Sequence, residues 1–128
     1  MAEKAHILIL EDQVETQVLL QKQLGAAGYR VTIAADGLQG LMKLEQIKPD
    51  LIIIDILMPK LNGLDFARAI RAQESTRAIP TIFLTAKDDP QSMVDGINAG
   101  ARYYITKPFE MSDLIKKIAK IINQRSRD

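Results

Sequence analysis

The fold is decided by the stretch Ile7-Leu8-Ile9-Leu10-Glu11-Asp12. Four consecutive apolar residues indicate a strand that is buried on both faces, as central strands of parallel sheets are. A second stretch, Leu51-Ile52-Ile53-Ile54-Asp55, repeats this pattern of an apolar run that ends in a carboxylate. We therefore expect two neighbouring central strands with acidic side chains at their carboxyl ends.

Short apolar runs alternate along the chain with segments of helical periodicity. The expected strands are His6–Leu10, Arg30–Ala34, Leu51–Ile54, Thr81–Leu84 and Arg102–Thr106. The clearest helical spacing runs from Leu114 to Ile122, where isoleucine or leucine recurs at i, i+1, i+4, i+7 and i+8. Strict alternation predicts an α/β fold, with a five-stranded parallel sheet and five helices in three layers.

The polarity of each strand predicts its place in the sheet. Residues 7–10, 51–54 and 82–84 are continuously apolar, so the first, third and fourth strands are expected at the centre. Residues 30–33 and 102–105 mix polar and apolar side chains, so the second and fifth strands are expected at the edges. With right-handed crossovers, this gives the flavodoxin-like order 2-1-3-4-5.

Several residues mark the ends of the expected helices. Asp36 and Asp89 are candidate N-caps, and Pro90 suits a first helical position. Gly28 is a candidate stop for the first helix. That helix is expected to present one broad apolar face, made of Val14, Val18, Leu20, Leu24 and Ala27.

Composition limits the classes of protein that this chain can belong to. It has 128 residues, 47% of them hydrophobic, a formal net charge of +1 and no cysteine. This suits one globular domain, expected at residues 1–123, with 124–128 as a C-terminal tail or the start of a linker. We expect a cytoplasmic domain, without a membrane span or the bulk charge for direct binding to nucleic acid.

Polar residues follow four of the five expected strands. Ligands bind open α/β sheets at the carboxyl ends of the strands, where the winding reverses. The strand beyond that switch point is followed only by Ala34-Ala35. The other four are followed by Glu11-Asp12, Asp55, Thr85 and Lys107. This coincidence is the strongest functional signal in the sequence.

The chemistry of these side chains indicates a phosphoryl site. Three carboxylates repel one another unless a cation lies among them, and all-oxygen ligands favour Mg²⁺ before Ca²⁺. A metal ion, the Lys107 ammonium and the Thr85 hydroxyl together can hold the equatorial oxygens of a transferring phosphoryl group. Asp55 would then be the nucleophile that becomes an aspartyl phosphate.

These residues resemble the receiver domain of two-component response regulators, over almost the whole chain. The resemblance rests on residues 7–12, on Asp55-Ile56-Leu57-Met58-Pro59 with Asn62-Gly63-Leu64, on Leu84-Thr85-Ala86 and on Thr106-Lys107-Pro108-Phe109. Each piece is weak alone, whereas the ordered set is highly specific.

The resemblance implies a role for each acidic residue. Asp55 would accept a phosphoryl group from the phosphohistidine of a histidine kinase. Asp12 and Asp55 would bind Mg²⁺ directly, together with the backbone carbonyl of Leu57. Glu11, which stands where the family most often has Asp, would hold a metal-bound water.

The resemblance also implies a switch. Thr85 would hydrogen-bond the phosphoryl group, Lys107 would pair with it, and Tyr104 would turn inward when Thr85 moves. The Lys107-Pro108 peptide bond would be cis. The face made by the fourth helix, fifth strand and fifth helix would change its protein contacts, and Arg102 on that face weakens the case for the dimer of winged-helix relatives.

The partners implied are a sensor histidine kinase or phosphotransfer protein and an unidentified downstream protein, with the chain a monomer or a weak phosphorylation-dependent dimer. Such a domain would catalyse only its own phosphotransfer and autodephosphorylation.

Three other functions stay open at this point. A phosphohydrolase of the haloacid-dehalogenase type would need a second Asp two residues after its nucleophile, where this chain has Leu57. A flavin or nucleotide module would need a phosphate cradle after the first strand, where Glu11-Asp12 would repel phosphate. A docking receiver that works without phosphorylation would not need Asp12, Asp55, Thr85 and Lys107 to be intact.

Overall fold

The computed structural model describes residues 4–126, and within them five strands alternate with five helices. The strands are β1 (His6–Leu10), β2 (Arg30–Ala34), β3 (Leu51–Ile54), β4 (Thr81–Thr85) and β5 (Tyr103–Thr106). The helices are α1 (Val14–Ala26), α2 (Gly37–Leu44), α3 (Gly63–Arg71), α4 (Pro90–Asn98) and α5 (Met111–Ser126). Every expected strand is present, to within one residue at its ends.

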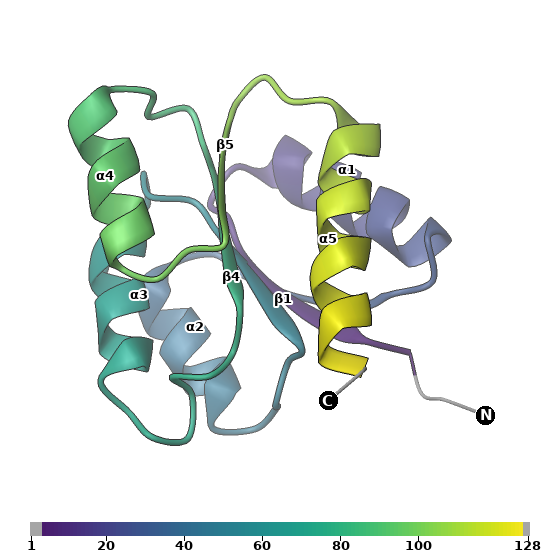
Figure 1. Cartoon of the computed structure of the whole chain (residues 1–128), viewed down its shortest axis with the longest axis horizontal. Helices are drawn as coiled ribbons and strands as arrows, with labels where there is room; N and C mark the ends of the chain where they lie inside the picture. Colours follow the sequence, from purple (N-terminus) through teal and green to yellow (C-terminus); the bar gives the residue numbers. More distant parts are fainter. Residues whose placement is uncertain (1–3, 127–128) are drawn as a thin grey trace.

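All strand pairs are parallel, and their order is β2-β1-β3-β4-β5. Helices α1 and α5 cover one face of the sheet, and α2, α3 and α4 cover the other (Figure 1). The predicted fold class and strand order are confirmed. The polarity of the strands explains the order, since β1, β3 and β4 are fully buried and β5 is only half-buried.

The core lies in two clusters because side chains alternate across the pleated strands. Leu8, Ile52 and Phe83 point toward α2, α3 and α4, where they meet Phe66. Their neighbours in the strands point the other way and pack against Leu20, Leu24, Leu114, Ile118 and Ile121 of α1 and α5. Apolar side chains thus cover both faces of the three central strands, and the carboxylates and Lys107 lie after the strand ends.

Most helix ends follow the sequence prediction. The Asp36 and Asp89 carboxylates accept hydrogen bonds from the backbone N–H of Gln39 (2.8 Å) and Ser92 (3.0 Å). Gly28 has φ +101°, the left-handed conformation that ends α1. Helix α5 continues to Ser126, past the domain boundary expected at residue 123, and residues 127–128 lie outside the described residues.

The apolar face predicted for α1 is wrong in part. Val14 and Val18 are 66% and 58% exposed, whereas Leu20 and Leu24 are completely buried. Consecutive helical residues are about 100° apart, so Val18 and Leu20 lie roughly 200° apart around the axis and cannot share a face. The row that packs on the sheet is the one that contains the two leucines, and the valines face solvent.

His6 begins β1, and its ring Nε2 lies 2.6 Å from Thr32 Oγ1 of β2. Among the described residues, no helix is long and apolar enough to cross a membrane.

Candidate functional site

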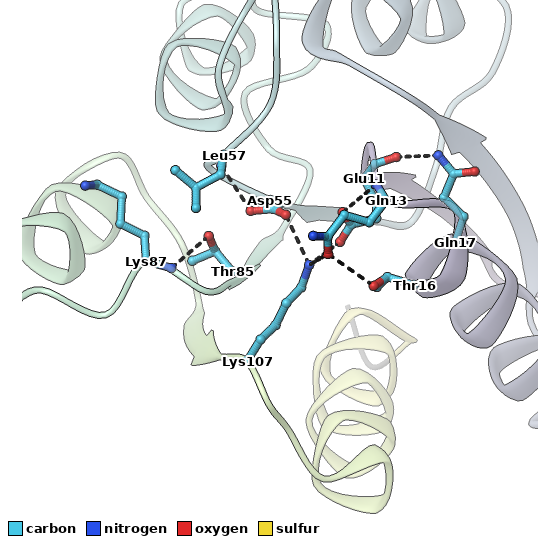
Figure 2. Close-up of polar contacts among 9 residues, drawn as sticks. All are labelled: Glu11, Gln13, Thr16, Gln17, Asp55, Leu57, Thr85, Lys87 and Lys107. Carbon is cyan, nitrogen blue, oxygen red and sulfur yellow. Dashed lines mark hydrogen bonds and ion pairs between the residues drawn. The ribbon is translucent and has the colours of Figure 1, made fainter.

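The carboxyl ends of β1, β3, β4 and β5 bring together Glu11, Asp55, Thr85 and Lys107 (Figure 2). One carboxylate oxygen from each of Glu11, Asp12 and Asp55 lies within 4.8 Å of the others. Glu11 and Asp55 are buried, whereas Asp12 is exposed. The grouping follows from the parallel sheet, in which neighbouring strands end side by side.

Lys107 enters this cluster from the end of β5. Its Nζ lies 2.5 Å from Glu11 Oε1, 3.1 Å from Asp55 Oδ2 and 3.4 Å from Gln13 Oε1. The ammonium therefore bridges two buried carboxylates and offsets part of their repulsion. The Lys107-Pro108 peptide bond is cis, as the resemblance implied.

The pKa values of Glu11 and Lys107 are shifted by burial and by the contact between the two side chains. Burial raises the pKa of Glu11, although the hydrogen bond from Lys107 opposes that rise. Burial disfavours the charge of Lys107, but the hydrogen bond to Glu11 and the charge of Asp55 outweigh it, so the pKa of Lys107 is raised. The lysine is thus held as a cation between the carboxylates of Glu11 and Asp55.

The loop after Asp55 is packed closely against the aspartate. Leu57 N–H donates to Asp55 Oδ1 at 3.0 Å, and the Asp55 N–H donates to Leu10 O at 3.0 Å. Asn62 caps α3 by accepting from the N–H of Asp65. At Gly63, a side chain would collide with the backbone carbonyl of Asp55. In the sequence, Asn62 and Gly63 stand out only as part of a motif. In the structure, Asn62 begins α3, and Gly63 permits the close approach to Asp55.

Thr85 and Tyr104 meet through the backbone of one residue, Lys87. The Thr85 hydroxyl is fully buried and accepts from Lys87 N–H at 3.3 Å. The Tyr104 hydroxyl donates to Lys87 O at 2.6 Å. Its half-buried ring lies 5.9 Å from the Phe83 ring, centroid to centroid. Thr85 and Tyr104 are thus both hydrogen-bonded to the backbone of the loop between β4 and α4.

The acidic cluster fits a hard divalent cation. Its ligands are carboxylates, its oxygens converge, and exposed Asp12 leaves a side open for water or a phosphoryl oxygen. Glutamines that the sequence argument did not select also lie here: Gln13 N–H donates to Glu11 Oε2 at 3.1 Å, and Gln17 Nε2 donates to Glu11 O at 2.6 Å. Glutamine in a first helical turn carries no distinctive signal, so only the fold reveals these contacts.

A doubly wound parallel sheet with acidic residues, a hydroxyl and a lysine after its strands is typical of α/β proteins that bind ligands at the carboxyl ends of the strands. Within that class, the family model of the response regulator receiver domain matches residues 7–119. The chain belongs to this family of receiver domains of two-component systems.

Curated relatives of this chain include response regulators and transcriptional regulatory proteins. The chain is 40% identical over 119 residues to the response regulator ArlR of Staphylococcus aureus, an alignment that covers 93% of this chain and 53% of the relative. It is 38% identical over 122 residues to the uncharacterized transcriptional regulatory protein YkoG of Bacillus subtilis, covering 95% and 53%. The chain thus spans about half the length of these relatives.

Solved structures are similar over nearly the whole chain. The receiver domain of a signal transduction histidine kinase from Syntrophus aciditrophicus has a TM-score of 0.90 and 32% identity, covering 97% of this chain and 94% of that one. The receiver domain of the sensor histidine kinase PA1611 from Pseudomonas aeruginosa has a TM-score of 0.86 and 35% identity, covering 94% and 98%. That second structure has a magnesium ion coordinated in its active-site cleft.

Asp12→Asn is expected to stabilise the metal-free protein by about 1 kcal/mol, because it removes the one carboxylate of the cluster that Lys107 does not contact. The same substitution should reduce the rise in melting temperature that Mg²⁺ produces, since a ligand that binds only the folded state stabilises it by mass action. Thermal melts with and without Mg²⁺ measure both effects. A variant that melts lower without metal and responds to Mg²⁺ as wild type does would show that Asp12 is not part of the site.

Proposed function

We propose that this domain is a phosphorylation-controlled signalling module in which Asp55 accepts a phosphoryl group from a histidine kinase or a phosphotransfer protein. The observation that carries the proposal is the contact between Asp55 and Lys107 inside a cluster of three converging carboxylates. A nucleophilic carboxylate needs neighbouring positive charge, because both it and the incoming phosphoryl group are anionic.

The chemistry assigned to the residues is a single displacement. An Asp55 carboxylate oxygen forms a bond to phosphorus while the bond from phosphorus to the donor histidine nitrogen breaks, and that bonding pair stays with the nitrogen. The Lys107 ammonium, which contacts the Asp55 carboxylate before the reaction, would pair with the phosphoryl oxygens after it. The Thr85 hydroxyl would donate a hydrogen bond to one of those oxygens. Donors fixed in advance cost little reorganisation.

We assign the cation site to Mg²⁺, held directly by Asp12, Asp55 and the backbone carbonyl of Leu57, with Glu11 acting through a water molecule. When bound, the metal supplies positive charge next to the phosphoryl oxygens. The same groups would serve phosphotransfer and autodephosphorylation, so the domain would catalyse only reactions of its own Asp55. The side chain at position 57 is leucine and offers no general acid of the kind that a phosphohydrolase needs.

The test is chemical labelling of Asp55. Incubation with a small acyl phosphate and Mg²⁺ should add one phosphoryl mass to the intact protein, and hydroxylamine should remove it. Asp55→Asn should abolish the labelling, whereas Asp65→Asn, on the exposed face of α3, should leave it unchanged. Undiminished labelling of the Asp55 variant would reject the assignment.

We further propose that phosphorylation rearranges the surface made by α4, β5 and α5. Helix α4 is weakly anchored, because its buried residues are only Ser92 and Gly96 while Met93, Val94 and Ile97 are exposed. Thr85 immediately precedes the loop that leads into α4, and the Tyr104 hydroxyl donates to Lys87 O in that loop. A shift between two arrangements would expose a different surface to a protein partner.

Amide hydrogen exchange should detect this rearrangement. Beryllofluoride, which mimics a phosphoryl group on a carboxylate, should change exchange severalfold in α4 and β5 and leave β1 and β3 unaffected, since those strands are in the centre of the core. Changes confined to α1 and α2 would contradict the proposed surface.

The downstream partner is proposed only by class. The relatives named above include a transcriptional regulatory protein, so a DNA-binding output remains one expected use of the switch. We propose a protein partner for the domain itself, with a monomer or a weak phosphorylation-dependent dimer as its state. Arg102, whose Nη1 lies 3.3 Å from Gln124 Oε1, is already engaged on this surface.

A further inference from the structure

The side chain of Gln17 connects helix α1 back to the end of β1. Its Nε2 donates to the backbone oxygen of Glu11 at 2.6 Å, across six residues of sequence (Figure 2). The backbone of Gln17 makes the ordinary helical bond, from its N–H to Gln13 O at 3.0 Å. The side-chain bond is therefore additional to what the helix requires, and it ends on the peptide that joins the two acidic residues.

Each other polar group of Glu11 is also engaged. Its N–H donates to Ala34 O at 3.0 Å, and its carboxylate accepts from Lys107 Nζ and from the N–H of Gln13. The Gln17 bond occupies its remaining group, the carbonyl. Because a peptide unit is planar, a fixed Glu11 carbonyl also fixes the nitrogen and Cα of Asp12. The exposed Asp12 side chain starts from that Cα and makes none of the hydrogen bonds just described.

We propose that Gln17 is a positioning residue for the metal site, and that its hydrogen bond to Glu11 O holds the Glu11–Asp12 peptide in the orientation that directs Asp12 toward Asp55. The proposal rests on the assignment of this cluster to Mg²⁺. Groups that orient metal ligands without touching the metal typically change metal affinity 10- to 100-fold when they are removed. Gln17 is half-buried on a helix surface, so its loss leaves the core intact.

The test compares two glutamines on the same helix. Gln17→Met keeps the length and helix propensity of the side chain but removes the donor. Gln21→Met makes the same change one turn further along α1, at an exposed residue. Mg²⁺ affinity is measured by calorimetric titration, and the metal-free melting temperature is measured in parallel. A further variant, Gln17→Asn, keeps the amide on a side chain that is one methylene shorter.

We expect Gln17→Met and Gln17→Asn to bind Mg²⁺ about tenfold more weakly than wild type, with Gln21→Met within twofold of wild type. The metal-free melting temperatures of the variants should not follow the order of their Mg²⁺ affinities, because the hydrogen bond from Gln17 to Glu11 O orients a ligand more than it stabilises the fold. Wild-type affinity in both Gln17 variants, or an equal loss in Gln21→Met, would overturn the proposal while leaving the magnesium site in place. Failure of wild type to bind Mg²⁺ would instead overturn the magnesium assignment, and this inference with it.

Discussion

Gly63→Ala is expected to destabilise the protein by about 3 kcal/mol and to abolish phosphorylation of Asp55. A Cβ at this position would collide with the carbonyl oxygen and carbon of Asp55 and with a methyl group of Ile54. Two of these atoms belong to the backbone, so they cannot rotate away as the end of a flexible side chain would. Forced overpacking of this kind costs about 1–3 kcal/mol, and the upper end applies because the backbone must move.

The functional loss has the same cause. Separation of Gly63 from Asp55 would carry the loop with it, including Leu57, whose N–H holds the Asp55 carboxylate. Urea denaturation gives the free energy of unfolding, and acyl-phosphate labelling gives the loss of function. Gly25→Ala is the control, because a Cβ there meets no atom within 4 Å and alanine should stabilise α1 by about 0.5–1 kcal/mol. Equal stability of the two variants would contradict the close approach.

The arrangement of the sheet and the cluster at its edge were predictable from local patterns. Continuous apolar runs distinguish the central strands from the edges, and a parallel sheet brings the residues that follow those strands to one place. Glu11, Asp55 and Lys107 could therefore be grouped before any coordinates were known. Their roles in phosphorylation are proposals that the experiments above test.

What sequence patterns did not reveal depends on how elements pack. Val14 and Val18 looked like part of an apolar face, but the angle at which α1 meets the sheet selects the row of Leu20 and Leu24. The Gln17 bond depends on the distance between the first turn of α1 and the end of β1. The helical repeat of about 100° per residue does separate Val18 from Leu20, but it does not say which of the two rows packs on the sheet. That choice and the Gln17 bond are both set by contacts between segments.

The expectation of an electrostatically strained, metal-free site also needs adjustment. The sequence predicts that Glu11, Asp12 and Asp55 repel one another unless a cation lies among them. In the structure, Lys107 contacts two of them. Burial is the main cause of the raised pKa of Glu11, and the charge of Asp55 adds to it, so these two carboxylates still repel each other. Within the cluster, the loss of Lys107, which contacts both, should therefore be the most costly.

Lys107→Met should lower the free energy of unfolding by about 3 kcal/mol at neutral pH. The substitution keeps a chain of similar length but leaves the Glu11 carboxylate, 2% exposed, without its cation and beside Asp55. Breaking a buried pair by removing one partner costs roughly 3–5 kcal/mol, and the lower end applies because the lysine side chain is 14% exposed. Lys117→Met is the control, since its pair with Asp113 is more exposed and should contribute under about 1 kcal/mol.

The pH dependence distinguishes this electrostatic cause from a simple loss of packing. Burial already raises the pKa of Glu11, and removal of Lys107 takes away the hydrogen bond that opposed the rise. A raised folded pKa means that the folded state binds the proton more tightly, so the variant loses stability as pH rises through that pKa and regains it on acidification. The loss of stability relative to wild type should therefore become smaller below neutral pH, as Glu11 becomes protonated.

At alkaline pH the loss of stability should become smaller again, because wild type loses the contribution of Lys107 as pH rises through the raised pKa of that lysine. Urea denaturation of both proteins across this range measures the loss of stability, and a loss that is constant with pH would show that Lys107 stabilises the fold by packing and not by its charge.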